Sequence, residues 1–154
     1  MTSPTAFEIA AMKRAVGRAR KACNEAGKSG IAAAVLRDNR IVSLEANQVF
    51  KDQDPTHHAE IVALGAAAQA IGQADLSGCV LVSTLQPCEM CLAAARFSGI
   101  KRIVLGAQKS DVDTRYFAFP HLNMSDFVGP GKEFIAIGGV LQSDVLDLYV
   151  NGDE

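Results

Sequence analysis

The sequence predicts an α/β fold in which helices cover the faces of a mixed or largely parallel β-sheet. The chain has 154 residues, of which 49% are hydrophobic and 21% charged, so it can bury one substantial core. Short apolar runs typical of strands alternate with stretches of helical periodicity, in the order hairpin, helix, strand, helix, strand. This alternation is typical of a sheet with helices packed on it. We expect residues 1–154 to form a single domain.

Helix and hairpin signals occupy the first part of the chain. Apolar residues recur at helical spacing over residues 5–26, and Gly27 provides a stop, which predicts an amphipathic helix. Two short apolar runs, 31–36 and 41–44, flank an Asp-Asn pair within residues 37–40. Because Asp and Asn favour tight turns, these runs are expected to form a β-hairpin.

The remaining elements are predicted with fewer signals. Residues 56–71 are rich in alanine and leucine and contain no proline, which predicts a buried helix with Pro55 near its first turn. Either Asp54 or Thr56 is expected to cap this helix. The other predicted elements are strands at 80–84, 103–105 and 134–137, a helix at 88–98 and a helical fragment at 145–150. Residues 151–154 are expected to fray.

Charge and composition restrict the setting of the protein. Acidic and basic side chains interrupt the apolar residues throughout the first thirty positions, so no signal peptide or membrane span is expected. We therefore expect a cytoplasmic protein without a membrane partner. The net charge of −2 argues against general capture of a polyanion, so nucleic acid is an unlikely partner.

Two short motifs contain the residue types that carry chemistry, residues 54–60 (DPTHHAE) and 87–91 (PCEMC). Cys88 and Cys91 are one helical turn apart, so both sulfurs can bind one metal ion together with a histidine from the first motif. Three protein ligands leave a fourth position for water, whose pKa a catalytic zinc ion lowers toward ~7. Glu60, in the first motif, suits the general acid/base that such a reaction needs.

Other interpretations of these motifs exist. A Cys-x-x-Cys pair is also found in thioredoxin-like redox sites and in half of a structural zinc site. The chain has four cysteines but no second Cys-x-x-Cys pair, and the first motif supplies both a further ligand and a base. The combination favours a catalytic zinc site.

The combination of His-x-Glu with Pro-Cys-x-x-Cys resembles the cytidine deaminase superfamily. With Asn47 ahead of Asp-Pro-Thr, the pattern is similar to the branch of guanine deaminases, fungal cytosine deaminase and bacterial tRNA adenosine deaminases. The resemblance covers roughly residues 5–110. It implies a three-layer α/β/α sandwich around a central five-stranded mixed sheet, Zn²⁺ as cofactor, and assembly into a homodimer.

The resemblance also implies roles for individual residues. The implied zinc ligands are His58, Cys88 and Cys91. Glu60 would carry the proton, Asn47 would hydrogen-bond the base, and the backbone amide of Ala59 would lie near the reacting water. Asn47 also fits a simple turn position. The spacing assigns His57 to the helix start or the pocket wall.

An aromatic run at residues 116–119 has two interpretations. It fits the core or a subunit interface, or it fits a wall against which a base stacks, in which case Phe119 would contact the substrate.

Departures from the family pattern bear on the substrate. Ala32 stands where many relatives have glycine, which predicts a bulkier pocket floor. Residues 116–119 replace an acidic residue expected of guanine deaminases, and the chain ends in acidic residues where tRNA-editing relatives are basic. We therefore expect a zinc-dependent hydrolytic deaminase of a free amino-substituted nucleobase or nucleoside. The alternatives are a tRNA adenosine deaminase and a non-catalytic zinc-stabilised binding protein.

Overall fold

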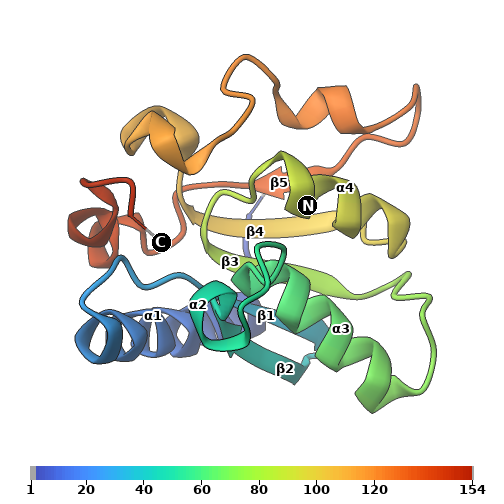
Figure 1. The fold of residues 1–154 in the computed structure, drawn as a ribbon. Helices are drawn as coiled ribbons and strands as arrows, with labels where there is room; N and C mark the ends of the chain where they lie inside the picture. The colour runs from blue at the N-terminus through green and yellow to red at the C-terminus, as the bar shows by residue number, and fades with distance from the viewer. Residues whose placement is uncertain (1–2, 154) are drawn as a thin grey trace.

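The computed structural model describes residues 3–153 and contains a five-stranded mixed sheet in the order β2-β1-β3-β4-β5 (Figure 1). The central strand β3 pairs antiparallel with β1 and parallel with β4. At one edge, β2 pairs antiparallel with β1. At the other edge, β5 pairs parallel with β4. The strands are β1 (Ala32–Arg37), β2 (Arg40–Ala46), β3 (Val80–Leu85), β4 (Arg102–Ala107) and β5 (Ile135–Ile137).

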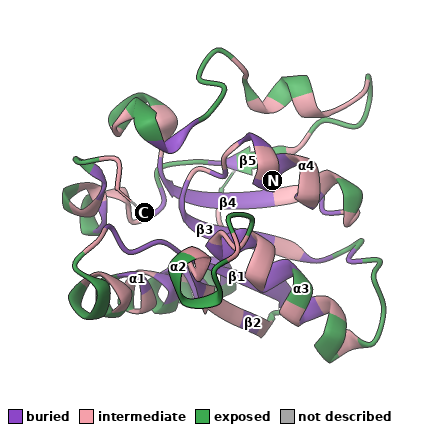
Figure 2. Cartoon of the chain, viewed as in Figure 1, coloured by how far each residue is buried: buried purple, intermediate pink, exposed green. Residues whose placement is uncertain are grey.

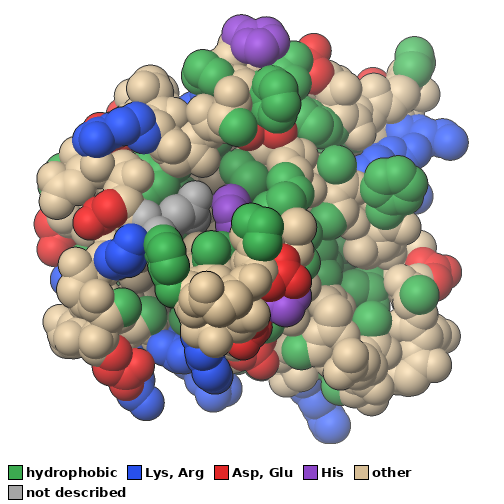
Figure 3. All heavy atoms as spheres, viewed as in Figure 1, with side chains coloured by type: hydrophobic (Ala, Val, Ile, Leu, Met, Phe, Trp, Pro, Cys, Tyr) green, Lys and Arg blue, Asp and Glu red, His purple; other side chains and the backbone are tan. Residues whose placement is uncertain are grey.

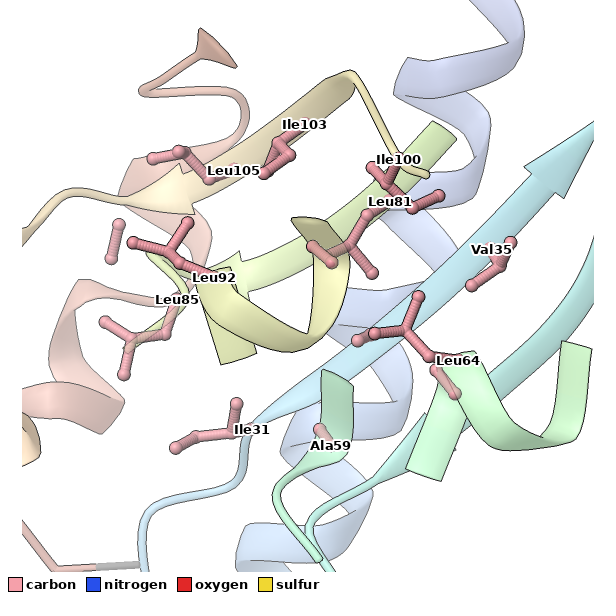
Figure 4. Close-up of a cluster of buried hydrophobic side chains, with 14 of the residues drawn as sticks. Ile31, Val35, Ala59, Leu64, Leu81, Leu85, Leu92, Ile100, Ile103 and Leu105 are labelled. Carbon is pink, nitrogen blue, oxygen red and sulfur yellow. The ribbon is translucent and has the colours of Figure 1, made fainter. Parts of the chain in front are cut away.

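Helices pack on both faces of this sheet, which confirms the predicted α/β fold with three layers. The α-helices are α1 (Ala6–Ala26), α2 (Val49–Asp52), α3 (Ala59–Ile71) and α4 (Glu89–Phe97). Side chains of β1 alternate between the faces: Val35 belongs to the apolar cluster that includes α3 and α4, whereas Leu36 belongs to the cluster that includes α1. Figure 4 shows the first cluster, and Figure 2 shows that the sheet is largely buried.

The helix α1 begins and ends where the sequence predicts. The Thr5 hydroxyl accepts a hydrogen bond from the Glu8 amide, and the Glu8 carboxylate accepts one from the Thr5 amide, so both form a capping box. Gly27 ends the helix in the left-handed conformation, with φ of 67°.

The predicted hairpin is also confirmed. The strands β1 and β2 pair antiparallel through a turn centred on Asp38 and Asn39, whose φ angles are 50° and 62°. Two consecutive residues with positive φ are the requirement of a type I′ turn, and Asp and Asn tolerate this conformation better than most residues.

The predicted start of the helix α3 is wrong. The helix begins at Ala59 with His58 as its N-cap residue, three positions later than expected. The Asp54 carboxylate accepts hydrogen bonds from the amide and the hydroxyl of Thr56, so this segment closes a local turn. The turn competes with helix formation and delays the helix.

The C-terminal part contains the predicted fifth strand, β5, and a series of short 3₁₀ helices instead of an α-helical fragment. Asp153 does not fray, because its carboxylate accepts a hydrogen bond of 2.6 Å from the Ser29 hydroxyl. Glu154 lies outside the described residues. The 3₁₀ helices are η1 (Lys109–Asp111), η2 (Thr114–Tyr116), η3 (Met124–Phe127), η4 (Gln142–Asp144) and η5 (Leu146–Tyr149).

Within residues 3–153, no helix is both long enough and apolar enough to cross a membrane.

The contact between Glu8 and Arg102 predicts a measurable contribution to stability. The Arg102 guanidinium donates hydrogen bonds of 2.6 and 3.0 Å to the Glu8 carboxylate, joins α1 to β4, and holds the pKa of Glu8 below its usual value. We expect Glu8→Gln to lower the free energy of unfolding by about 2 kcal/mol at neutral pH, because a buried charged hydrogen bond is lost.

Urea denaturation against pH checks this prediction. Because the folded-state pKa is depressed, the stabilisation is complete above the pKa of Glu8 in the unfolded chain and is lost as the pH falls through its folded-state pKa. Glu25→Gln, on the exposed part of the same helix, is the matched control and should change stability by less than about 0.5 kcal/mol. Equal losses in both variants would contradict the assignment.

Candidate metal centre and active site

The two sequence motifs meet at the amino ends of α3 and α4. His58 is the N-cap residue of α3, and Cys88 is the N-cap residue of α4, so each side chain projects from a helix start. Cys91 follows in the first turn of α4 and is fully buried. The strand β3 leads directly into α4, and the sheet thereby determines where both cysteines lie.

The three predicted ligands form a compact group. Nitrogen and sulfur donor atoms of His58, Cys88 and Cys91 all lie within 4.8 Å of one another, and the Cys88 sulfur is 3.5 Å from Nδ1 of His58. Hydrogen bonding from Cys91 lowers the pKa of Cys88 to about 4, whereas the pKa of Cys91 is raised well above its usual value. One nitrogen and two sulfurs at this spacing fit a zinc ion with one open coordination position.

Glu60 lies beside this group and is buried, with 4% of its surface exposed. Its Oε2 atom is 3.5 Å from the Cys91 sulfur, and its Oε1 atom accepts a 3.0 Å hydrogen bond from the Ser83 hydroxyl. Burial raises the pKa of Glu60 to about 7, and the negative charge of Cys88 adds to this effect. A carboxyl group with a pKa near neutrality can both accept and return a proton.

His57 lies outside the ligand group. Its ring nitrogens contact two carboxylates, that of Asp52 at the end of α2 at 2.7 Å and that of Asp54 between α2 and α3 at 3.1 Å. The group of donor atoms found among the described residues includes His58 and not its neighbour. The two adjacent histidines therefore differ in surroundings, as the motif spacing predicts.

A cavity of about 290 Å³ opens beside the ligand group and is lined in part by His58 and Cys88. Phe119, 53% exposed, borders this cavity, whereas Tyr116 is buried and lines both this cavity and a smaller one beside Glu60. Figure 3 shows histidine atoms in a recess on this face of the molecule. The core interpretation of the aromatic run therefore holds for Tyr116 and Phe117, and a contact between Phe119 and a substrate stays a prediction.

Two further predicted substrate contacts, Asn47 and Ala59, have different surroundings. The Asn47 side-chain oxygen accepts a 3.0 Å hydrogen bond from the Val49 amide, which matches the turn interpretation. Asn47 lines a neighbouring cavity. Ile31 lines both that cavity and the small cavity beside Glu60. Ala59 is fully buried in the first turn of α3, directly after His58.

The expectation of a bulkier pocket floor at Ala32 is wrong. Ala32 packs with Ala15 and Ala19 of α1, on the face of the sheet opposite to α3 and α4. Its methyl group fills space in the core because successive strand residues point to opposite faces.

The side chains that hold the cavity wall are not predicted by the sequence motifs. The Tyr116 hydroxyl donates a 2.6 Å hydrogen bond to Ser29, which in turn donates to Asp153. Tyr149 is fully buried, packs edge-on against Tyr116 at 5.8 Å, and donates to the Gly30 carbonyl at 2.8 Å. The hydrogen-bonded pairs are 87 or more residues apart in the chain, so no local pattern could reveal them.

Comparison with known proteins places this site in a family. A model described as the cytidine and deoxycytidylate deaminase zinc-binding region matches residues 6–107, a range that contains both motifs.

Several curated proteins are similar to the chain. It is 39% identical over 97 residues to a tRNA-specific adenosine deaminase of Agrobacterium fabrum, covering 63% of each chain. It is 32% identical over 100 residues to a guanine deaminase of Bacillus subtilis, covering 65% of this chain and 64% of that protein. It is also 46% identical over 98 residues to a tRNA(Ile)-lysidine synthase of Deinococcus deserti, covering 63% of this chain and 18% of that protein. The chain thus spans less than two thirds of each relative.

A solved structure from a study of A-to-I editing by tRNA:A34 deaminases is similar over most of the fold. It has a TM-score of 0.76 and 31% sequence identity, with 90% of this chain and 98% of that chain covered. The family match covers well over half of the chain, and the ligand geometry agrees with it. The chain belongs to the cytidine and deoxycytidylate deaminase family of zinc-dependent hydrolytic deaminases.

Proposed function

We propose that this chain hydrolytically deaminates an amino-substituted nucleobase, as the free base or its nucleoside, and releases ammonia. The observation that supports this most directly is the buried carboxyl group of Glu60 beside the group formed by His58, Cys88 and Cys91. A structural zinc site needs no such carboxyl group, and a carboxylate is costly to bury unless it is paired or hydrogen-bonded.

Each residue of the site has a proposed role. His58, Cys88 and Cys91 would hold a zinc ion, and a zinc ion bound there would lower the pKa of a water molecule toward neutrality. As the water oxygen bonds to the ring carbon, Glu60 takes one proton from that water and passes it to a ring nitrogen. Glu60 then takes the remaining proton from the added hydroxyl group and gives it to the amine, which leaves as ammonia when the carbon–nitrogen bond breaks. The backbone amide of Ala59 faces the reacting water, and Asn47 hydrogen-bonds the ring.

The cavity walls support a flat aromatic substrate. Phe119 offers an exposed ring at the mouth, and the buried ring of Tyr116 forms the wall nearer to Glu60. Aromatic side chains stack on nucleobases because both present flat π faces. We propose that Phe119 covers the base while it reacts.

Adenosine in tRNA is a second candidate substrate. The similarity to the Agrobacterium fabrum tRNA-specific adenosine deaminase favours it as much as the similarity to guanine deaminase favours a free base. The acidic residues near the C-terminus repel the phosphates of tRNA less than the sequence suggests. Asp147 forms a 2.8 Å ion pair with Arg20, which offsets its negative charge. The choice between the two substrates therefore depends on direct measurement.

The homodimer, the cytoplasmic location and the single domain over residues 1–154 remain predictions. Sedimentation of the purified protein would test the dimer.

Replacement of Glu60 tests the proton transfer. We expect Glu60→Gln to lower kcat by about 100- to 10,000-fold, because the amide cannot carry the proton. Zinc content should be unchanged, as Glu60 is not a proposed ligand. Ammonia release and metal analysis of the same samples check both statements. Normal turnover by the zinc-loaded variant would contradict the mechanism. It would indicate that a residue other than Glu60 transfers the proton.

The adjacent histidines provide a matched test of the ligand set. We expect His58→Ala to lose zinc and all turnover, because one of three protein ligands is removed. His57→Ala should retain one zinc per chain, because its side chain contacts Asp52 and Asp54 instead. Metal analysis after dialysis distinguishes the variants. Full zinc occupancy in His58→Ala would refute the assigned ligands.

A substrate panel decides between a free base and tRNA. We expect ammonia release from one of guanine, adenine, cytosine or their nucleosides, and no deamination of tRNA transcripts. The Glu60→Gln protein is the control for contaminating deaminases. Inosine formation in tRNA, lost as salt is raised, would replace the free-base proposal by the second candidate. No product from either class, with zinc bound, would favour a non-catalytic zinc-stabilised protein.

A further inference from the structure

A buried hydroxyl group, that of Ser83, contacts the proposed proton carrier Glu60. Ser83 lies in the central strand β3 and has no exposed surface. Its side chain points to the face covered by α3 and α4, between the apolar neighbours Leu81 and Leu85 of the same face. A polar side chain at such a position is costly unless its hydrogen bonds are satisfied.

Two acceptors lie within reach of this one hydroxyl group. The Ser83 oxygen is 3.0 Å from Oε1 of Glu60 and 2.7 Å from the carbonyl oxygen of Leu85. A serine hydroxyl has a single hydrogen and two lone pairs, and the hydrogen rotates to suit its partner. It can therefore donate to the Glu60 carboxylate. With its hydrogen turned to Leu85, it can instead accept a hydrogen bond from a protonated Glu60.

The contact also determines which carboxyl oxygen faces the ligand group. Ser83 contacts Oε1 of Glu60, whereas Oε2 lies 3.5 Å from the Cys91 sulfur. With one oxygen held by the strand, rotation of the carboxyl group is restricted. The second oxygen is then directed to the place where water and substrate would react.

We propose that Ser83 is a positioning residue that orients the Glu60 carboxyl group while Glu60 carries the proton during turnover. This inference rests on the proposed role of Glu60. The side chain of Ser83 is not needed to pair the strand, because the backbone of β3 is paired on both sides, opposite Ala33 and Leu105. The role of the hydroxyl group can therefore be separated from folding.

Four variants test the proposal. Ser83→Ala removes the hydroxyl group, and Ser83→Thr retains it. Ser83→Val has nearly the shape of threonine without the hydroxyl. Ser43→Ala is the matched control, because Ser43 is also buried and donates a 2.7 Å hydrogen bond to α3, at the Ala63 carbonyl. Zinc content and melting temperature are measured for each variant.

We expect Ser83→Ala and Ser83→Val to lower kcat about 10-fold or more, with KM within about twofold of wild type, because a hydrogen bond to a charged group is lost. Ser83→Thr should restore kcat to within about threefold, and Ser43→Ala should leave it unchanged. The assays use guanine and tRNA transcripts as probes. Difference infrared spectra against Glu60→Gln should show a shifted Glu60 carboxyl band in Ser83→Ala, and an unshifted band in Ser43→Ala.

The outcomes separate this inference from the proposed function. An unshifted Glu60 band in Ser83→Ala, or equal kcat in the threonine and valine variants, overturns the role of Ser83. If Ser83→Ala does not fold, the threonine and valine pair decides by the same two measurements. Wild-type protein that deaminates neither probe nor any base of the panel refutes the proposed function instead, while the infrared result still tests the contact.

Discussion

The carboxyl group of Glu60 lies out of contact with bulk water, next to one nitrogen and two sulfur donors, and this placement constrains the surrounding structure. A buried carboxylate is unfavourable unless nearby groups compensate for the lost hydration. Here Ser83 donates to one carboxyl oxygen, and a zinc ion bound by the three ligands would place positive charge near the other. The same burial raises the pKa of Glu60 to about 7, which suits a group that accepts and returns a proton.

The fold provides the rigidity that this placement needs. The central strand β3 is paired on both sides, carries Ser83, and leads directly to Cys88 at the start of α4. The helix α3 packs on β1 and β2 and presents His58 and Glu60 from its first turn. Backbone amides at helix starts are free to interact with a ligand, because they have no partner within the helix. The proposed metal ligands and the proposed proton carrier thus lie on the helices that pack against, or directly follow, the paired strands.

The wall of the cavity depends on a different kind of contact. Tyr116 is held by Ser29, which is bonded to Asp153, and Tyr149 packs against its ring. The C-terminal segment therefore supports a residue that lines the reaction site, although it contributes none of the proposed ligands. Changes in this segment can alter the shape of the cavity without altering the metal centre.

The sequence by itself determined those elements that depend on residues close to one another in the chain. Periodicity and the Gly27 stop predicted α1, the Asp-Asn turn predicted the hairpin, and the short spacing within the two motifs identified the zinc-binding family. The same spacing predicts His58, instead of His57, as the metal ligand. The tertiary structure decided what depends on contacts between distant residues. The bond from Ser83 to Glu60 spans 23 positions and that from Tyr116 to Ser29 spans 87, so neither leaves a periodic signal in the chain. The side of the sheet that Ala32 occupies likewise depends on strand register, which is set by pairing and not by the residue itself.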